Sequence, residues 1–187
     1  DDQKIKDAAA KVGLETDYTR PDFLASDTAG KIDTIKDIVL YEEKKRGVRF
    51  DFVLDLDLTS PMRTIDDLEK AFSIISADND AITLFSVSPA ERNPYFNMVE
   101  LNSEGYYSLP KTNPDGSVLS RQSAPPVYDL NASFYWYRRS FFDTDLKSPI
   151  TDRSLIFCMD HMCFDMDHPI DFDFLEYLLV NNKIDFM

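Results

Sequence analysis

The chain has 187 residues, 43% of them hydrophobic, which is enough for one domain with a full core. Its 34 acidic and 20 basic residues give a formal net charge of −14, which argues against binding a nucleic-acid polymer. The sequence shows neither a bilayer-spanning apolar run nor a secretory signal, and two cysteines do not make a disulfide scaffold. We therefore expect a cytoplasmic protein that does not enter a membrane.

Two helices are predicted in the first 50 residues. Residues 4–12 place apolar side chains on one helical face and end before Gly13, and residues 31–46 repeat the pattern before Gly47. The apolar, β-branched and aromatic residues that follow predict a buried strand over 48–54.

A polar turn follows this strand and leads into a third predicted helix. Thr64 can cap that helix, because Asp66 and Asp67 lie in the first turn and apolar residues recur at helical spacing after them. A strand, a short loop and a helix form half of a βαβ unit, in which ligands bind at the carboxyl ends of the strands. The residues that we expect at this edge are Asp57, Thr59, Ser60 and Arg63.

The second half of the chain predicts further strands, a hairpin and a last helix. The expected strands cover 81–87, 97–101, 106–109, 132–137 and 154–159, with a turn at 102–105 and a loop at 111–123. The last helix covers about 170–181, and we expect Phe172, Leu175, Leu178 and Leu179 to point inward. The alternation of helices and strands favours a three-layer α/β domain with a projecting arm near 95–110.

Two aspartates near the end of the chain are candidate metal ligands. If the segment of Asp165 and Asp167 is extended, both carboxylates point to one face and can converge on one cation. Mg²⁺ is often held by one or two carboxylates together with substrate phosphates and water, so this pair would suffice. The alternative is a pair of solvated loop acids.

An arginine and a tyrosine are candidate ligand-binding residues. Arg121 precedes an apolar strand and could bind a carboxylate through paired hydrogen bonds, although an exposed loop arginine is the alternative. Tyr135 lies in an aromatic strand, where core packing is the default.

Four blocks of the sequence, in order, resemble the acylneuraminate cytidylyltransferases, which are the CMP-sialic acid synthetases. The blocks are Leu-Ala-Ser-Asp-Thr-Ala at 24–29, Thr-Ser-Pro-Met-Arg at 59–63, 121–125 with 131–135, and Phe-Asp-Met-Asp at 164–167. The stretch 92–100 and Asp57 look closest to the bacterial legionaminate-type branch.

The resemblance implies a three-layer α/β/α, Rossmann-like nucleotide-diphospho-sugar transferase fold. It implies one domain over 1–187, with a homodimerisation arm at about 92–130. It also implies that Asp165 and Asp167 bind Mg²⁺ and serve catalysis, and that Arg20 and Ala29 bind the nucleotide. The residues it implies for the sugar are Arg121 at the carboxylate, with Tyr135, Asp57 and Asn93.

The function implied is the transfer of CMP from CTP to a nine-carbon α-keto acid sugar, with release of pyrophosphate. The family's glycine-rich phosphate loop has no counterpart, and Asp1-Asp2 resembles the end of the family's second strand region. We therefore expect that the N-terminal part of the domain is missing and that this chain binds triphosphate poorly. Two alternatives stay open: an enzyme resembling CMP-Kdo synthetase, and a truncated fragment that only dimerises or binds sugar.

Overall fold

The computed structural model describes residues 2–26, 29–114, 116, 118 and 120–186, except for the side chain of Arg121. The chain divides into two compact units. Unit 1 comprises Asp1–Leu56, Glu69–Leu84 and Phe134–Leu155, and unit 2 comprises Asp57–Leu68, Phe85–Ser133 and Ile156–Met187. Whether the whole forms one domain with an arm at about 92–130 stays a prediction.

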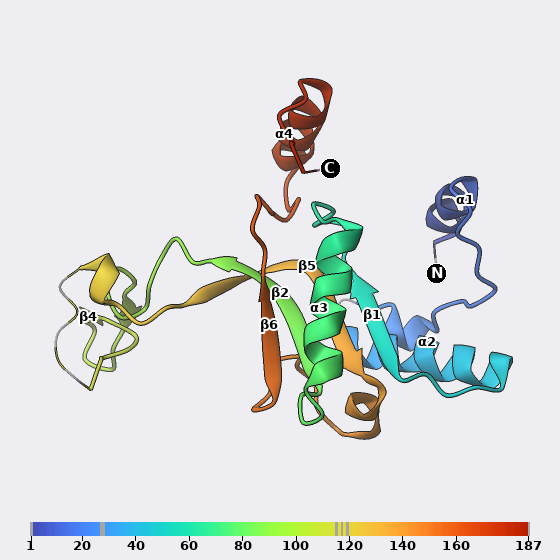
Figure 1. Ribbon diagram of the computed structural model, residues 1–187, viewed down its shortest axis with the longest axis horizontal. Coiled ribbons are helices and arrows are strands. Elements are labelled where there is room, and N and C mark those ends of the chain that lie inside the picture. The colour runs from blue at the N-terminus through green and yellow to red at the C-terminus, as the bar shows by residue number, and fades with distance from the viewer. Residues whose placement is uncertain (1, 27–28, 115, 117, 119, 187) are drawn as a thin grey trace. The chain divides into compact units, whose positions relative to one another are not determined.

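Four strands form one sheet in the order β1-β5-β2-β6 (Figure 1). Their bounds are β1 Phe52–Leu56, β5 Tyr128–Arg138, β2 Thr83–Pro89 and β6 Ser154–Cys158. Strand β1 pairs antiparallel with β5, and Asp55 lies opposite Tyr135. Helix α3 (Ile65–Ala77) connects β1 to β2, which are separated in the sheet by β5. A mixed sheet with flanking helices confirms the predicted α/β class.

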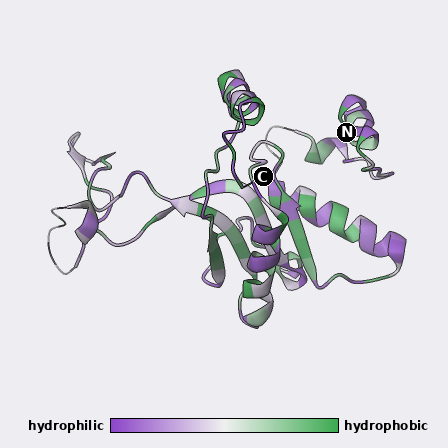
Figure 2. Ribbon diagram, turned by 45° about the horizontal axis from the view of Figure 1, so that its top comes forward, coloured by the Kyte–Doolittle hydropathy of each residue, from purple (hydrophilic) through white to green (hydrophobic). Residues whose placement is uncertain are grey.

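The predicted helices are present. They are α1 Gln3–Lys11, α2 Lys31–Arg46, α3 and α4 Pro169–Val180, and the chain also forms the short 3₁₀ helices η1 Asp22–Leu24, η2 Arg121–Ser123 and η3 Arg139–Asp143. Helix α2 ends as predicted, since Gly47 adopts a left-handed φ of 66°. Its last turn carries Lys44, Lys45 and Arg46 and is coloured hydrophilic in Figure 2. No described helix is long and apolar enough to cross a membrane.

The core of unit 1 is largely aromatic. Tyr137, Phe141 and Phe142 pack with their ring centroids 5.0 to 5.3 Å apart, and each is at most 2% exposed. Ile32 from α2 and Ile82 complete the cluster. Burying each large apolar side chain stabilises the fold by roughly 1.5–3 kcal/mol.

Strand β1 begins four residues later than predicted, because residues after α2 form hydrogen bonds with that helix. The Val48 amide donates to the Glu43 carbonyl at 3.3 Å, and the Phe50 amide donates to the Glu43 carboxylate at 3.1 Å. Val48 and Phe50 are therefore bonded to α2 instead of to a neighbouring strand.

The predicted hairpin is present but shorter. Strands β3 (Glu100–Leu101) and β4 (Tyr107–Ser108) pair antiparallel, and Gly105 has a φ of 86° in the connecting turn. Strand β3 starts late because the Asn97 amide donates to the Asn93 carbonyl at 2.9 Å, which curls the preceding residues into a turn.

Helix α4 does not bury the face that the sequence predicts. Leu175 and Leu178 are buried, but Phe172 is 59% exposed and Leu179 is 48% exposed, so the prediction for these two residues is wrong. The helix is apolar on nearly all sides, so periodicity alone could not select the packed face.

Candidate functional site

The polar turn after β1 lies in unit 2 and is held by an arginine of the same turn. Nη1 of Arg63 donates to the carbonyl oxygens of Asp57, Ser60 and Ser133 at 2.9, 2.8 and 2.8 Å. The Asp57 amide also donates to the Ser133 carbonyl at 3.3 Å. The guanidinium group therefore fixes the backbone of the turn against β5.

The serine of this turn is buried completely. The Ser60 hydroxyl donates to the Asn131 carbonyl at 2.6 Å, lies 3.3 Å from the Phe164 carbonyl and is 3.4 Å from the Cys163 sulfur. Burial raises the pKa of the Cys163 thiol, which favours its neutral form. Ser60 thus supports the turn from inside and has no surface for a ligand.

Strand β5 has an unusual backbone at the point where the turn meets it. Ala132 has a φ of 57°, which costs free energy for a residue with a Cβ. The Asn131 side chain on one side of it accepts from the Ser86 hydroxyl at 2.6 Å and donates to the Ser88 hydroxyl at 3.1 Å. These bonds, with those of Ser60, hold the strained residue in place.

Helix α3 begins with the capping predicted for Thr64. The Thr64 hydroxyl accepts from the Asp67 amide at 3.1 Å, and the Asp67 carboxylate accepts from the Thr64 amide at 2.7 Å. Nε2 of His161 lies 3.0 Å from the same carboxylate, and the His161 ring stacks on Phe186 at 3.7 Å. Burial acts to raise the pKa of Asp67, but the hydrogen bonds from His161 and Thr64 hold it below its usual value.

The predicted metal ligands follow β6 in an irregular segment of unit 2. Oδ1 of Asp165 is buried and has no hydrogen-bond partner within the described chain, whereas Asp167 is exposed. A buried carboxylate oxygen without a partner is costly, and a bound cation would compensate it. The described residues contain no cluster of three or more His, Cys, Asp or Glu suited to a metal. A cation at this pair would need ligands from substrate or water, as Mg²⁺ commonly takes.

Asn93, a predicted sugar contact, lines a cavity of about 370 Å³ in unit 2. Its Nδ2 donates to the Pro125 carbonyl at 3.0 Å and its Oδ1 accepts from the Tyr95 amide at 2.9 Å. The cavity is large enough for a small ligand. Its remaining lining residues are Pro89, Ala90, Glu91, Ala124, Pro125, Pro126, Val127, Tyr128 and Cys158.

Tyr135, a second predicted sugar contact, lies in unit 1 beside an ion pair. The Lys31 ammonium lies 2.9 Å from Oδ2 of Asp55 and 4.8 Å from the centroid of the Tyr135 ring. The first residue of α2 is thereby held against a half-buried aromatic ring by a carboxylate and by a cation–π contact.

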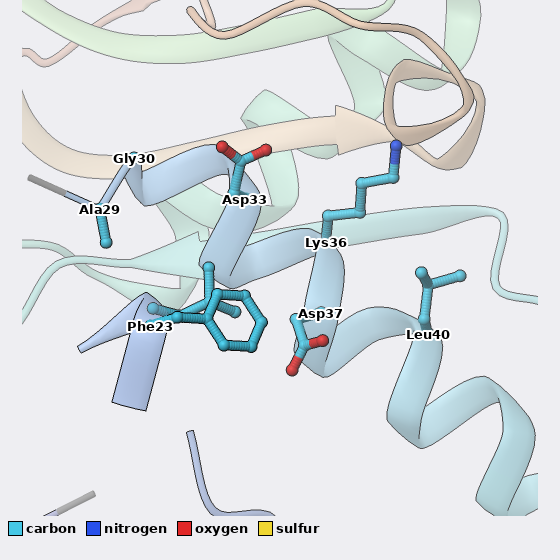
Figure 3. Close-up of a pocket in the computed structure, with 8 residues that line it drawn as sticks. Phe23, Ala29, Gly30, Asp33, Lys36, Asp37 and Leu40 are labelled. Atoms are coloured by element: carbon cyan, nitrogen blue, oxygen red, sulfur yellow. The ribbon is translucent and has the colours of Figure 1, made fainter. Parts of the chain in front are cut away.

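Ala29, predicted to contact the nucleotide, lines an open pocket of about 460 Å³ in unit 1 (Figure 3). Phe23 from η1 and the acidic side chains of α2 form much of its wall. Asp33 binds Lys147 at 2.6 Å, and Asp37 accepts from the Tyr18 hydroxyl at 2.6 Å. Burial, with Asp37, raises the pKa of Tyr18 to about 12.

The predicted site residues divide between the two units. Asp57, Asn93, Asp165 and Asp167 belong to unit 2, and Arg20, Ala29 and Tyr135 belong to unit 1. The side chain of Arg121 lies outside the described part of the chain. Sequence reasoning missed the bond between Ser60 and the segment of Asp165, and it missed the contact between His161 and Asp67.

The chain is 37% identical over 185 residues to post-translational flagellin modification protein B of Campylobacter coli, which covers 98% of this chain and 76% of the relative. It is 33% identical over 180 residues to CMP-N,N'-diacetyllegionaminic acid synthase of Campylobacter jejuni, covering 96% of this chain and 74% of the relative. The chain belongs to the cytidylyltransferase family of the CMP-sialic acid synthetase type.

Two further findings accompany this assignment. No family model matches the chain. The solved structure of CMP:2-keto-3-deoxy-manno-octonic acid synthetase with CTP resembles this family member with a TM-score of 0.62 and 15% identity, covering 97% of this chain and 79% of that one. At that identity the likeness shows the fold alone. The predicted family and the nucleotidyltransferase fold are thus confirmed.

Proposed function

We propose that the protein is a CTP-dependent enzyme that forms a CMP-activated nonulosonic acid of the legionaminic type. The observation that supports this most is the 33% identity, over 96% of the chain, to a CMP-N,N'-diacetyllegionaminic acid synthase. A synthase of the same name from Legionella pneumophila is 28% identical over 98% of the chain. An enzyme resembling CMP-Kdo synthetase has less support, since that likeness is one of fold.

The proposed reaction is a displacement at phosphorus. The anomeric hydroxyl oxygen of the sugar bonds to the α-phosphorus of CTP, the bond from that phosphorus to the bridging oxygen breaks, and pyrophosphate leaves. The hydroxyl proton passes to water. Positioning of the two substrates and compensation of phosphate charge supply most of the catalysis in such a reaction.

Asp165 and Asp167 are the proposed ligands of Mg²⁺. The buried, unpartnered Oδ1 of Asp165 supports this assignment, because it offers an oxygen that a hard cation prefers. Bound there, Mg²⁺ would compensate the negative charge of the phosphates. The role of the chain itself is to hold the two carboxylates in place.

The proposed sugar contacts combine charge and shape. Arg121 would bind the sugar carboxylate, because a guanidinium group can form two parallel hydrogen bonds with it. Tyr135 offers an aromatic face, and Asn93 lines a cavity of about 370 Å³. Asp57 and the nucleotide contacts Arg20 and Ala29 complete the proposed set.

We also propose that the protein is a cytoplasmic homodimer. The support is the hairpin, where Leu101, Tyr106 and Tyr107 are 63%, 70% and 71% exposed. Exposed apolar and aromatic side chains gathered on one hairpin are typical of interfaces.

The experiment incubates the protein, produced from its complete reading frame, with CTP, Mg²⁺ and a panel of acidic sugars. The panel contains a legionaminic acid, a sialic acid and Kdo, and the assay measures pyrophosphate. Fastest release with the legionaminic acid is expected. Release with Kdo alone would favour the alternative enzyme, and no release with any sugar would contradict the proposed activity.

A further inference from the structure

The residue that carries the proposed metal ligand is held on both sides by the turn after β1. On one side, the Ser60 hydroxyl lies 3.3 Å from the Phe164 carbonyl. On the other side, the Met166 amide donates to the Thr59 carbonyl at 2.8 Å. Asp165 lies between these two backbone contacts. The residues on either side of its Cα are therefore fixed to consecutive residues of one turn.

The turn is itself fixed by side-chain hydrogen bonds to backbone carbonyl oxygens of unit 2. One guanidinium nitrogen of Arg63 bonds three carbonyl oxygens, two of the turn and that of Ser133 in β5. The Ser60 hydroxyl bonds the Asn131 carbonyl of the same strand at 2.6 Å. The sheet, the turn and the segment of Asp165 are thus connected in series within unit 2.

We propose that Ser60 and Arg63 are positioning residues, which set the place of the Asp165 carboxylate and thereby the affinity for the divalent cation. This inference rests on the proposed function, because that function gives Asp165 its cation. Neither residue touches the cation or a substrate in this proposal. Each acts through the backbone on which the ligand is carried.

The burial of Ser60 makes its contacts suitable for positioning the Asp165 carboxylate. Ser60 is 0% exposed, so water cannot replace its hydroxyl when the side chain is shortened. The segment of Asp165 belongs to no helix or strand, so no regular backbone hydrogen bonds of a helix or sheet fix the position of the carboxylate. Supporting contacts of this kind typically change metal affinity by about tenfold or more when they are removed.

The first experiment compares Ser60→Ala with a matched control, Thr83→Val. Both changes remove a hydroxyl from a side chain that is 0% exposed, but the Thr83 hydroxyl bonds Pro149 and Ser154 of unit 1. Mn²⁺, a spectroscopic substitute for Mg²⁺, is titrated into each protein and free Mn²⁺ is read by electron paramagnetic resonance. We expect the Mn²⁺ dissociation constant to rise about tenfold in Ser60→Ala and to stay unchanged in Thr83→Val.

The second experiment varies Arg63, so that the test does not depend on one variant folding. Arg63→Gln removes the charge and the reach of the side chain, whereas Arg63→Lys keeps a donor that ends about one bond short. Mn²⁺ affinity should fall in the order wild type, Arg63→Lys, Arg63→Gln. Thermal melts followed by circular dichroism confirm that each variant is folded at the titration temperature.

Restoring turnover with excess metal distinguishes a residue that positions the metal ligand from a residue that binds the metal itself. Saturating Mg²⁺ should restore most of the turnover of Ser60→Ala, because its carboxylate ligands are intact. Equal Mn²⁺ affinity in Ser60→Ala, Thr83→Val and wild type would overturn the inference while leaving the proposed function in place. If wild type binds no Mn²⁺ and releases no pyrophosphate, the proposed function fails first.

Discussion

Arg139 of unit 1 is buried and Arg63 of unit 2 is partly buried, and the two arginines bind different kinds of partner. In unit 1, Arg139 is 5% exposed and binds Glu43 through two nitrogens at 2.7 and 2.9 Å and Asp143 at 2.9 Å. In unit 2, Arg63 bonds backbone carbonyl oxygens, and the turn it supports holds Asp165, whose Oδ1 has no partner among the described residues. The charges around Arg139 are compensated within the protein, as expected of a structural cluster. Oδ1 of Asp165 has no such compensation among the described residues, as expected where a ligand completes the set.

The largest expected effect concerns the stability that the Arg139 cluster gives to the fold. Arg139→Leu leaves the Glu43 carboxylate, whose side chain is 12% exposed, without its partner and should lower the free energy of unfolding by about 3–5 kcal/mol. Chemical denaturation measures this change. The control is Arg49→Leu, because that arginine is 63% exposed and forms a surface ion pair with Asp143, so its loss should cost less than about 1 kcal/mol. Equal effects of the two changes would contradict the assignment of the Arg139 cluster to stability.

The proposed metal binding at Asp165 is tested by Asp165→Asn. The amide keeps the shape of the side chain but loses the charge that would bind Mg²⁺, so turnover and Mn²⁺ affinity should each fall at least about 100-fold. Pyrophosphate release and Mn²⁺ titration measure the two quantities. Asp173→Asn on α4 is the control, since it removes one exposed carboxylate from the same part of the chain. Wild-type values in Asp165→Asn would remove the metal assignment.

A smaller effect is expected at the start of α3. Thr64→Ala removes the hydroxyl that accepts from the Asp67 amide and should lower the free energy of unfolding by about 1 kcal/mol. Urea denaturation checks this, with the exposed Ser73→Ala of the same helix as control. Mn²⁺ affinity should not change, because Thr64 has no part in holding Asp165. A loss of affinity would show that the cap and the metal segment are coupled.

The smallest expected effect is the response to acid. Arg139 holds the pKa of Glu43 below its ordinary 4.5, and the pKa of Asp143 lies below 3.8 because its bonds to Arg139 and Arg49 outweigh burial. Carboxylates with lowered pKa contribute stability that is complete above their ordinary values and is lost as the pH falls through the lowered ones. Thermal melts between pH 6 and about pH 3 should therefore show a steeper decline for wild type than for Arg139→Leu. Parallel declines would contradict the pairing.

The sequence predicted elements whose causes are local and missed those whose causes are distant. The bounds of α2 follow from its own periodicity and from Gly47, and both were predicted correctly. The inward face of α4 and the start of β1 depend on neighbours that no periodicity reveals. Phe172 is exposed because the helix packs through Leu175 and Leu178. Val48 is not part of β1 because its amide donates to the Glu43 carbonyl.

The same distinction holds for the candidate site. The Asp165 and Asp167 pair and the residues of the polar turn were recognisable from motif and position. Their connection was not, because Ser60 and Cys163 lie 103 residues apart in the chain and come within 3.4 Å only in the fold. The sequence offered only a serine within a polar motif; its complete burial, which indicates support of the turn instead of ligand contact, is visible only in the fold.

The left-handed backbone at Ala132 affects the contacts of both neighbouring residues at once. Asn131 and Ser133 receive the contacts of Ser60 and Arg63, and both flank this residue. Glycine would be accommodated there without strain, whereas a β-branched side chain would favour a regular strand and slide both neighbours out of register. Ala132→Val should therefore weaken the contacts of Ser60 and Arg63, and with them the proposed cation binding at Asp165, while all the proposed ligand residues stay unchanged.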